Sequence, residues 1–341
     1  MWPDALFPVD PYPGSTPDSS FVHVAGHSHP LRPSRSGWAV AGAPLDTWLD
    51  RHGASPSRDR VPLLTYGSNR CPSKITWLRA VHGLGDEPVV VLRARTTGLA
   101  AVWASGLRLR DAQRPAVLAA APGLVEQHAV WLATPAQIAA LDRCEGRGDR
   151  YRLARLDTGE VRTEDGALIE RPWCYLGRSE IRRPLLVDGQ PVRCADVAQD
   201  AAAALVGAPA GGDGLVARTE RGAPDPANWP AALFAYGSLQ PGHPAWTLVA
   251  PHAAGAPVAA SVPGTVLDTG LGYPAWLPDG PGVTPGAVVP LRDPAGLLPV
   301  LDEYEGPDYE RVRVAVDGRV CWAYAWRSPV DGFRVLPDGW R

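Results

Sequence analysis

Four short motifs occur twice in this chain, in the same order. They are an apolar run that ends in Tyr-Gly-Ser, a Pro-Gly turn before a strand-like segment, Leu-Asp-x-x-Glu-Gly, and Trp-x-Tyr. The pairs are YGS at 66–68 and 236–238, APGLVEQHAVWL at 121–132 and TPGAVVPL at 284–291, LDRCEG at 141–146 and LDEYEG at 301–306, and WCY at 173–175 and WAY at 322–324. One such match is easily a coincidence, but four in register predict a tandem duplication of one domain.

The length of the chain agrees with this duplication, because 341 residues suffice for two domains that each have a core. A Gly/Pro-rich stretch separates the two copies and is the expected linker. We predict an N-terminal arm and partly ordered extension at 1–60, a first domain at 61–206, a linker at 207–231 and a second domain at 232–341. Residues 1–20 are rich in Pro, Ser and Asp and are expected to be flexible.

Composition narrows the class of protein. The 36 Gly and 37 Pro favour a loop-rich α+β or β-rich body over a helical bundle. A net charge of −3 gives no reason to expect a nucleic acid or an acidic membrane as partner. The five Cys include no CxxC pair, so a reducing cytoplasm is the simplest location. We find neither a secretory signal pattern nor an apolar run long enough to span a membrane.

Three histidines, His23, His27 and His29, lie close together in HVAGHSH. Such a group resembles a metal-binding tract. No convincing acidic or Cys partner lies near it in the sequence, and Gly and Ser interrupt it. Ordinary loop histidines are therefore favoured, and no metal is expected.

Each Tyr-Gly-Ser follows a short apolar run, PLLT in the first copy and ALFA in the second. This pattern is typical of a buried strand that ends in a tight loop. Successive backbone N–H groups in such a loop can form a concavity that binds an anion. The alternative is a strand-ending turn that binds nothing.

A helix is predicted around each Leu-Asp-x-x-Glu-Gly. In the first copy, Thr134 and Gln137 form a capping-box pattern, and Gly146 suits the C-terminal stop. The second copy starts at Asp293, and Pro299 is expected either to kink that helix or to make it begin later.

A glutamate occupies the last turn of both predicted helices, as Glu145 and as Glu305. A carboxylate there faces the negative end of the helix dipole, which disfavours the ionised form and raises its pKa. Helix stability alone would avoid Glu at this position, so its presence in both copies indicates a function. The alternative is an exposed Glu that tolerates the cost.

An apolar strand ending in Tyr-Gly-Ser, followed some 70–80 residues later by LDxxEG, resembles the gamma-glutamylcyclotransferase-like superfamily. The second copy is similar over its whole length, from FAYGSLQPGHPAW through LDEYEGPDYERV to LPDGWR. The first copy is looser, since EGRGDRYRLARL lacks the Tyr-x-Arg that the second shows at Tyr309 and Arg311. The second copy is therefore the stronger candidate site.

The resemblance implies an α+β fold of two domains, each a small mixed-strand β-barrel flanked by helices, with a pocket at one barrel mouth. In that family the loop holds the α-carboxylate and amine of a γ-glutamyl group, and the Glu is the general acid/base. Carried to this chain, the catalytic residues are Glu305 and Glu145. The substrate-binding residues are Tyr236, Gly237, Ser238, Leu239, Tyr66, Gly67, Ser68, Asn69, Tyr309 and Arg311. For Tyr309 and Arg311, simple pairing on a strand is an equal alternative.

The resemblance also implies a reaction, the cyclisation of a γ-glutamyl amine or peptide to 5-oxoproline with release of the amine. This transferase or lyase chemistry needs no metal or cofactor, and its partner is a small γ-glutamyl compound. Two alternatives stay open: a small-ligand-binding or interaction protein on the same fold, and another amide-bond chemistry in the same pocket. The sequence identifies neither the amine nor the oligomeric state.

Overall fold

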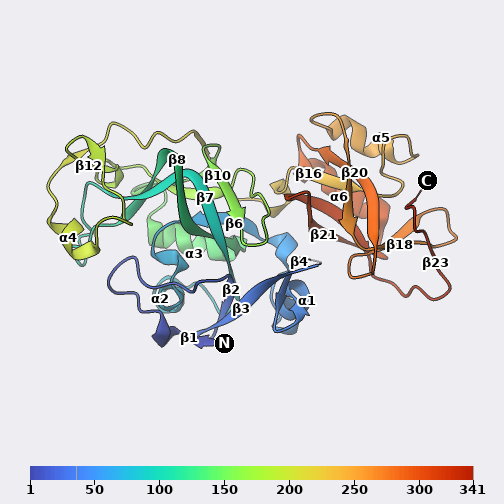
Figure 1. The fold of residues 1–341 in the computed structure, drawn as a ribbon, viewed down its shortest axis with the longest axis horizontal. Helices are drawn as coiled ribbons and strands as arrows, with labels where there is room; N and C mark the ends of the chain where they lie inside the picture. The colour runs from blue at the N-terminus through green and yellow to red at the C-terminus, as the bar shows by residue number, and fades with distance from the viewer. Residues whose placement is uncertain (36, 341) are drawn as a thin grey trace. The chain divides into compact units, whose positions relative to one another are not determined.

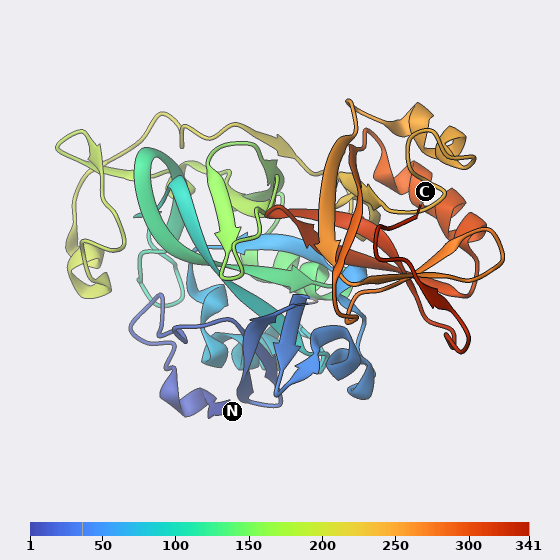
Figure 2. The same ribbon diagram turned by 45° about the vertical axis from the view of Figure 1, so that its right-hand side comes forward.

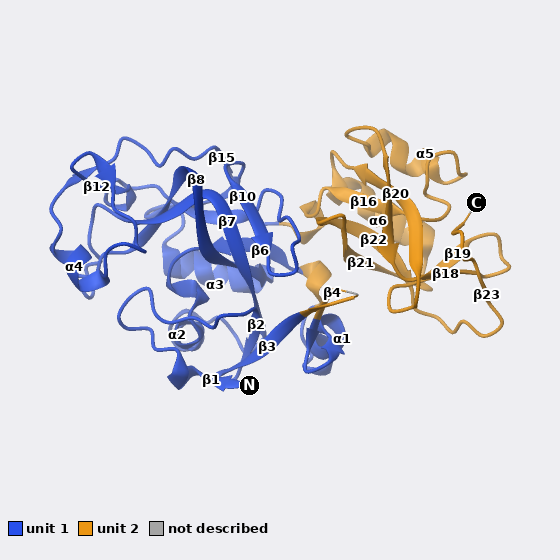
Figure 3. Ribbon diagram, viewed as in Figure 1, with its two compact units in different colours: residues 1–32, 39–55, 60–224 blue, residues 33–38, 56–59, 225–341 orange. Residues whose placement is uncertain are grey.

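The structure is a computed structural model that describes residues 1–35 and 37–340 (Figure 1). The chain divides into two compact units, which Figure 3 shows in separate colours. The first unit comprises Met1–Arg32, Ala39–Ser55 and Arg60–Pro224, and the second comprises Pro33–Trp38, Pro56–Asp59 and Asp225–Arg341. Each unit combines helices with β-sheet, so the predicted α+β class is confirmed. No helix among the described residues is both long and apolar enough to cross a membrane.

The first unit is built on a large mixed sheet with the strand order β15-β9-β11-β6-β8-β7-β2-β3. The elements up to residue 224 are β1 (Trp2–Pro3), β2 (Phe21–Val24), β3 (His27–Ser34), β4 (Gly37–Val40), β5 (Ala43–Pro44), α1 (Leu45–Arg51), β6 (Val61–Thr65), α2 (Pro72–His82), β7 (Val89–Trp103), β8 (Ala116–Ala133), α3 (Pro135–Glu145), β9 (Tyr151–Leu156), β10 (Glu160–Thr163), β11 (Trp173–Gly177), β12 (Leu185–Val187), β13 (Gln190–Pro191), α4 (Gln199–Ala204), β14 (Ala208–Pro209) and β15 (Ala217–Thr219). The strand order is an open path, so the predicted closed barrel is not confirmed.

Strand β6 lies at the centre of this sheet, with β8 on one side and β11 on the other. All five of its residues are buried. A continuous apolar run of this kind is typical of a strand that is covered on both faces. Because β6 ends next to Tyr66, a fully buried strand fixes the position of the first Tyr-Gly-Ser loop.

The N-terminal residues differ from the flexible arm expected for 1–20. They run beside α2, as Figure 2 shows for the dark blue segment, and the Ser73 hydroxyl donates to the backbone oxygens of Asp4 at 2.9 Å and Phe7 at 2.6 Å. Tyr12 is only 8% exposed. Aromatic side chains spaced along this Pro-rich segment supply apolar surface to bury, which outweighs the cost of ordering the chain.

The Gly/Pro-rich stretch 207–231 contributes two short strands. β14 pairs with β12, and β15 pairs with β9 at the edge of the large sheet. Backbone hydrogen bonding of this kind needs no particular side chain, so composition alone did not indicate it.

The second unit has one sheet with the order β17-β20-β16-β22-β21 and a smaller one with the order β19-β18-β23. Its elements are β16 (Ala232–Ala235), α5 (Trp246–Val249), β17 (Val258–Pro263), β18 (Thr265–Asp268), β19 (Pro274–Leu277), β20 (Val283–Pro290), α6 (Pro294–Glu305), β21 (Tyr309–Val316), β22 (Arg319–Trp326) and β23 (Arg334–Val335). Both strand orders are open paths. Helix α6 packs its buried Leu297, Leu298 and Leu301 against β16 and β22 through the apolar cluster that includes Leu233 and Trp322.

Candidate functional site

The same three-strand frame occurs once in each unit. In the first, β6 lies between antiparallel β8 and parallel β11. In the second, β16 lies in the same way between β20 and β22. Leu63 pairs with the Trp of the first Trp-x-Tyr, and Leu233 pairs with the Trp of the second. In both units the Tyr-Gly-Ser begins three residues after this leucine. The repeated motifs therefore occupy equivalent places, which supports the predicted tandem duplication.

The tyrosine of each Tyr-Gly-Ser points into the core and ties two motifs together. The Tyr66 hydroxyl donates to the backbone oxygen of Tyr175 at 2.6 Å, and the Tyr236 hydroxyl donates to that of Tyr324 at 2.7 Å. Burial raises the pKa of both Tyr66 and Tyr236, so both phenols stay protonated donors. The two tyrosines thus fix the loop, and the residues that follow them face the pocket.

A second pair of hydrogen bonds joins Trp-x-Tyr to the helix that carries the glutamate. The Tyr175 hydroxyl donates to Asp142 Oδ1 at 2.7 Å, and the Tyr324 hydroxyl donates to Asp302 Oδ1 at 2.8 Å. Each Asp lies three residues before the glutamate, on the same helix. Sequence reasoning missed these four residues, although all of them belong to the repeated motifs and the repetition was the signal that could have found them.

Arg311, for which strand pairing was the alternative to substrate binding, is not among the residues that line the pocket of the second unit. Its Nη1 forms an ion pair with Asp302 Oδ2 at 2.9 Å, and its guanidinium lies 5.0 Å from the centre of the Trp322 ring. In the first unit, Arg147 forms the matching ion pair with Asp142 at 3.0 Å. Arg311 therefore anchors helix α6, and Arg147, from the loop after α3, anchors α3 in the first unit.

Tyr309 does line the second pocket, and its hydroxyl donates to the backbone oxygen of Pro274 at 2.6 Å. Tyr309 pairs across the sheet with Trp326, two residues after Tyr324. In the first unit Tyr151 pairs with Gly177, two residues after Tyr175, so Tyr151 is the counterpart of Tyr309. Tyr151 is buried and lines the first pocket. The first copy thus keeps this tyrosine, although the sequence motif around it is lost.

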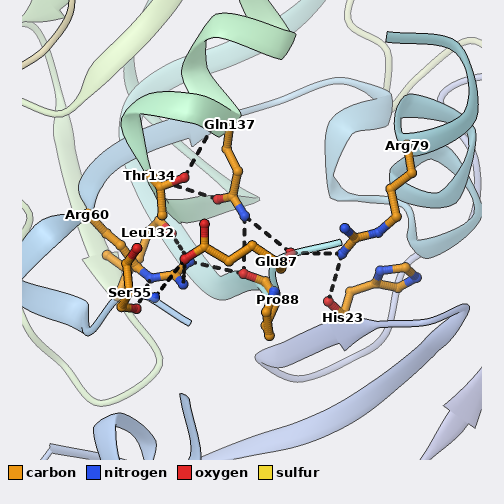
Figure 4. A network of polar contacts seen from close by, with 9 residues as sticks. All are labelled: His23, Ser55, Arg60, Arg79, Glu87, Pro88, Leu132, Thr134 and Gln137. Carbon is orange, nitrogen blue, oxygen red and sulfur yellow. Dashed lines mark hydrogen bonds and ion pairs between the residues drawn. The ribbon is translucent and has the colours of Figure 1, made fainter. Parts of the chain in front are cut away.

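Helix α3 is anchored at its start by the predicted capping box, which the structure confirms. The Thr134 hydroxyl accepts from the Gln137 backbone N–H, and the Gln137 side chain accepts from that of Thr134. Figure 4 shows that the Gln137 amide also donates to the backbone oxygen of Pro88, at 3.1 Å. The buried Arg60 donates to the same oxygen at 3.0 Å and pairs with Glu87 at 2.9 Å. This network fixes one end of the helix that presents Glu145 at the other.

The larger pocket lies in the first unit and has a volume of about 330 Å³. Its wall includes every residue predicted for the first site: Tyr66, Gly67, Ser68, Asn69 and Glu145. Pockets that bind small molecules measure about 300–1,000 Å³. The first pocket therefore has room for a small metabolite.

Asn69 links the loop to the glutamate in the first unit. Its side-chain amide donates to Glu145 Oε1 at 2.8 Å. Its backbone oxygen accepts from the Trp131 indole at 2.9 Å, and that indole is fully buried in β8. The Glu145 carboxylate is thus held against the Tyr-Gly-Ser loop by a side chain that is itself fixed.

The pocket of the second unit measures only about 20 Å³ and is lined by Tyr236, Gly237, Ser238, Leu239, Glu305 and Tyr309, among others. A volume of that size holds about one water molecule. Helix α6 continues through Pro299, so the later helix start is excluded and Glu305 lies in its last turn. Burial raises the pKa of Glu305 to about 7. The second unit therefore has a glutamate suited to proton transfer at neutral pH but little room beside it.

The loop glycines are approached closely by different groups. A Cβ at Gly67 would lie 2.8 Å from the Tyr12 hydroxyl oxygen, and a Cβ at Gly237 would lie 2.7 Å from Pro274 Cγ. Tyr12 lines the first pocket, and its hydroxyl accepts from the Ala116 backbone N–H at 3.0 Å. Sequence reasoning missed Tyr12, because it lies in a segment that has no counterpart in the second copy.

The histidines of HVAGHSH make local contacts. His23 Nε2 lies 3.0 Å from Asp4 Oδ1, His27 Nδ1 lies 3.0 Å from the Ala25 backbone oxygen, and His29 packs against Trp48. Among residues 1–35 and 37–340, no group of three or more His, Cys, Asp and Glu side chains is arranged to hold a metal ion.

Each unit thus has one pocket, and each pocket is lined by a Tyr-Gly-Ser loop and by a glutamate from the end of a helix. Residues 233–341 match the family described as gamma-glutamyl cyclotransferase, AIG2-like. This match confirms the resemblance for the second unit, where the Tyr-Gly-Ser, LDxxEG and Trp-x-Tyr motifs all lie.

Solved structures give weaker similarities. YkqA from Bacillus subtilis is 16% identical, with a TM-score of 0.24 over 79% of this chain and 84% of its own. An AIG2-like protein from Mus musculus is 21% identical, with a TM-score of 0.22 over 29% of this chain and 80% of its own. Protein ytfP from Escherichia coli is 24% identical, with a TM-score of 0.23 over 32% of this chain and 94% of its own. TM-scores this low carry no argument about function. A search of curated proteins found no match.

Proposed function

We propose that this chain is a γ-glutamyl cyclotransferase that converts a γ-glutamyl amine or peptide to 5-oxoproline and the free amine. One observation carries the proposal: in each unit, a Tyr-Gly-Ser loop and a glutamate from the end of a helix line the same pocket. The family match over the second unit supports the same reaction class.

The reaction needs few groups from the protein. The α-ammonium of the substrate loses one proton before its nitrogen attacks the γ-carbonyl carbon and a second one after the five-membered ring has closed. The bond between that carbon and the departing nitrogen breaks, and the departing nitrogen takes up both protons and leaves as an ammonium. Holding the substrate in the ring-closing conformation supplies several kcal/mol, up to about 7–11.

A single glutamate can relay these protons one at a time. Its ionised form accepts the proton from the ammonium, and its protonated form returns a proton to the departing amine. A pKa of about 7 leaves Glu305 close to half ionised at neutral pH. In the first pocket, the Asn69 amide orients Glu145 beside the loop. Backbone N–H groups of the loop would stabilise negative charge that develops on the carbonyl oxygen.

The first pocket is the proposed site of turnover in this conformation. It measures about 330 Å³, against about 20 Å³ in the second unit, where Pro274 and Tyr309 lie close to the loop. This assignment differs from the sequence expectation, which favoured the second copy on its motifs. The more complete motif thus favours the second unit, and the larger pocket favours the first. The experiment below determines which unit carries out the reaction.

The test measures 5-oxoproline released from a panel of γ-glutamyl compounds, among them γ-glutamyl ethylamide and γ-glutamyl alanine. Variants Glu145→Gln and Glu305→Gln are compared singly and together. Glu303→Gln, an exposed position on α6, is the matched control. We expect Glu145→Gln to lower kcat by about 10²–10⁴-fold, which is the usual contribution of general acid/base catalysis.

Three results separate the alternatives. Loss of product with Glu305→Gln but not with Glu145→Gln would transfer the reaction to the second unit. Full product from the double variant would refute the role of both glutamates. Binding of the compounds without 5-oxoproline would favour a small-ligand-binding protein on the same fold.

A further inference from the structure

The first pocket has a strongly positive wall. Three basic side chains from different segments line it: Lys74 from α2, Arg150 from the loop after α3, and Arg182 from a short 3₁₀ helix after β11. We call these three residues the cationic cluster. None of them forms an ion pair with a carboxylate within the described part of the chain.

Lys74 and Arg182 are each only 5% exposed. The Lys74 ammonium lies 3.3 Å from the centre of the Trp77 ring. Arg182 Nη1 donates to its neighbour's backbone oxygen at 3.3 Å, and its buried Nε has no hydrogen-bond partner. A buried charge without an opposite charge or a full set of hydrogen bonds is costly. Both residues thus lack the anionic partner that such burial normally requires.

The cationic cluster lies close to Glu145 in the first pocket. Burial, followed by the charge of Glu145, raises the pKa of the Cys144 thiol to about 11, whereas the charges of Lys74, Arg110 and Arg150 act in the opposite direction. Arg150 Nη2 also donates to the Cys144 backbone oxygen at 3.0 Å. Lys74 and Arg150 therefore lie within electrostatic range of the helix end where Glu145 sits.

Two further arginines in the wall share a single carboxylate. Arg108 pairs with Asp111 at 2.9 Å, and Arg110 pairs with the same carboxylate at 3.1 Å. They are not counted in the cluster. Since one carboxylate balances only one of them, the two arginines together leave one net positive charge beside the three cations and Glu145.

The second pocket has no such wall. Its lining contains Glu305, Tyr309 and apolar or hydroxyl side chains, and it includes no Lys or Arg. Arg182 belongs to the segment after β11 that the second copy lacks. The charge difference therefore arises from parts of the first unit that lie outside the repeated motifs.

We propose that the first pocket selects γ-glutamyl conjugates whose amine portion is anionic, with a multiply charged group as the best match. This inference rests on the proposed function for the γ-glutamyl part of the ligand. The α-carboxylate and α-ammonium of that part cancel each other, and one of the three cations is balanced by Glu145. With the net charge of Arg108, Arg110 and Asp111 added, three positive charges then remain near the amine portion, which suits a multiply charged group such as a dicarboxylate or a phosphate monoester.

The experiment uses the full chain and three probes. γ-Glutamyl glutamate carries two carboxylates on its amine portion, γ-glutamyl phosphoethanolamine carries a phosphate, and γ-glutamyl glutamine amide is a neutral match to the first. Binding is measured by calorimetry with the Glu145→Gln protein, and 5-oxoproline release is measured with the unaltered protein. We expect at least one anionic probe to exceed the neutral one by tenfold or more in both measurements.

Variants assign this preference to the cluster. Arg182→Gln and Lys74→Gln are each expected to weaken the anionic probes by about 10- to 100-fold, the usual effect of losing a charge-assisted contact. Binding of the neutral probe should change by less than about threefold, which also reports that the variant is folded. Arg152→Gln is the matched control, because Arg152 bonds to Thr219 and does not line the pocket.

Each outcome decides the inference. A larger effect on γ-glutamyl phosphoethanolamine or on γ-glutamyl glutamate supports it and identifies the acidic group. Equal binding of charged and neutral probes, no binding of any probe, or an unchanged preference in both variants would overturn it. Charge-selective binding without 5-oxoproline would keep the inference and reject the proposed reaction, so the two failures are distinguishable.

Discussion

Replacing Glu305 by Gln is predicted to change how the stability of the second unit depends on pH. Burial raises the pKa of this carboxyl from 4.5 to about 7, so the folded unit holds the proton more tightly than the unfolded chain does. The stability that comes from the protonated side chain is fully present below about pH 4.5 and is lost as pH rises through about 7. The interval between the two pKa values corresponds to about 3 kcal/mol.

Because Gln stays neutral, the Glu305→Gln variant escapes this loss. We expect it to gain up to about 3 kcal/mol over the unaltered protein at pH 9 and nothing at pH 4.5. Hydrogen–deuterium exchange of peptides from α6 and β22, corrected for intrinsic rates, measures the stability of this unit separately from the first. Glu303→Gln on the same helix is the control, since that side chain is exposed. Parallel pH curves for Glu305→Gln and the unaltered protein would refute the burial argument.

Two further predictions concern the Tyr-Gly-Ser loops. Tyr66→Phe removes the phenol donor from the buried backbone oxygen of Tyr175, which keeps only the weaker contact with the Cys174 thiol, and should lower the free energy of unfolding by about 1 kcal/mol or more, with Tyr236→Phe expected to act in the same direction in the second unit. Equal stability of both variants and the unaltered protein in urea would contradict this. Gly67→Ala should impair ligand binding in the first pocket, because the new Cβ meets the Tyr12 hydroxyl oxygen. Adding Tyr12→Phe should restore part of the binding, and no restoration would exclude that contact as the cause.

Local motifs made the loops and the helices predictable from the sequence. The Thr134–Gln137 capping box and the buried strand before Tyr66 depend on residues that are close in the chain, and both are present in the structure. The repetition of the motifs then predicted that Glu145 belongs with the loop, and the two share a pocket. The same logic would have reached Asp142, had the repeated Leu-Asp been considered along with the Glu.

The size and charge of the pockets could not be predicted in this way. Tyr12 reaches the first loop from a segment more than fifty residues earlier, and Arg182 comes from a segment without a repeat partner. Which unit has space depends on side chains that close over the loop, such as Pro274 in the second unit. These contacts are long-range and unique to one copy, so neither periodicity nor repetition indicates them.

The two copies differ in motif completeness, in pocket volume and in pocket charge. The second unit has the more complete motif and a buried Glu305 with a pKa of about 7, but its pocket is small and carries no basic residue. The first unit lacks the Tyr-x-Arg motif, yet Tyr151 lies at the position of Tyr309 and Arg147 pairs with Asp142 as Arg311 pairs with Asp302. Its pocket is larger and lined by basic residues. The absence of the motif from the first copy therefore leaves its frame intact, and the two pockets differ in the volume and charge that they offer a ligand.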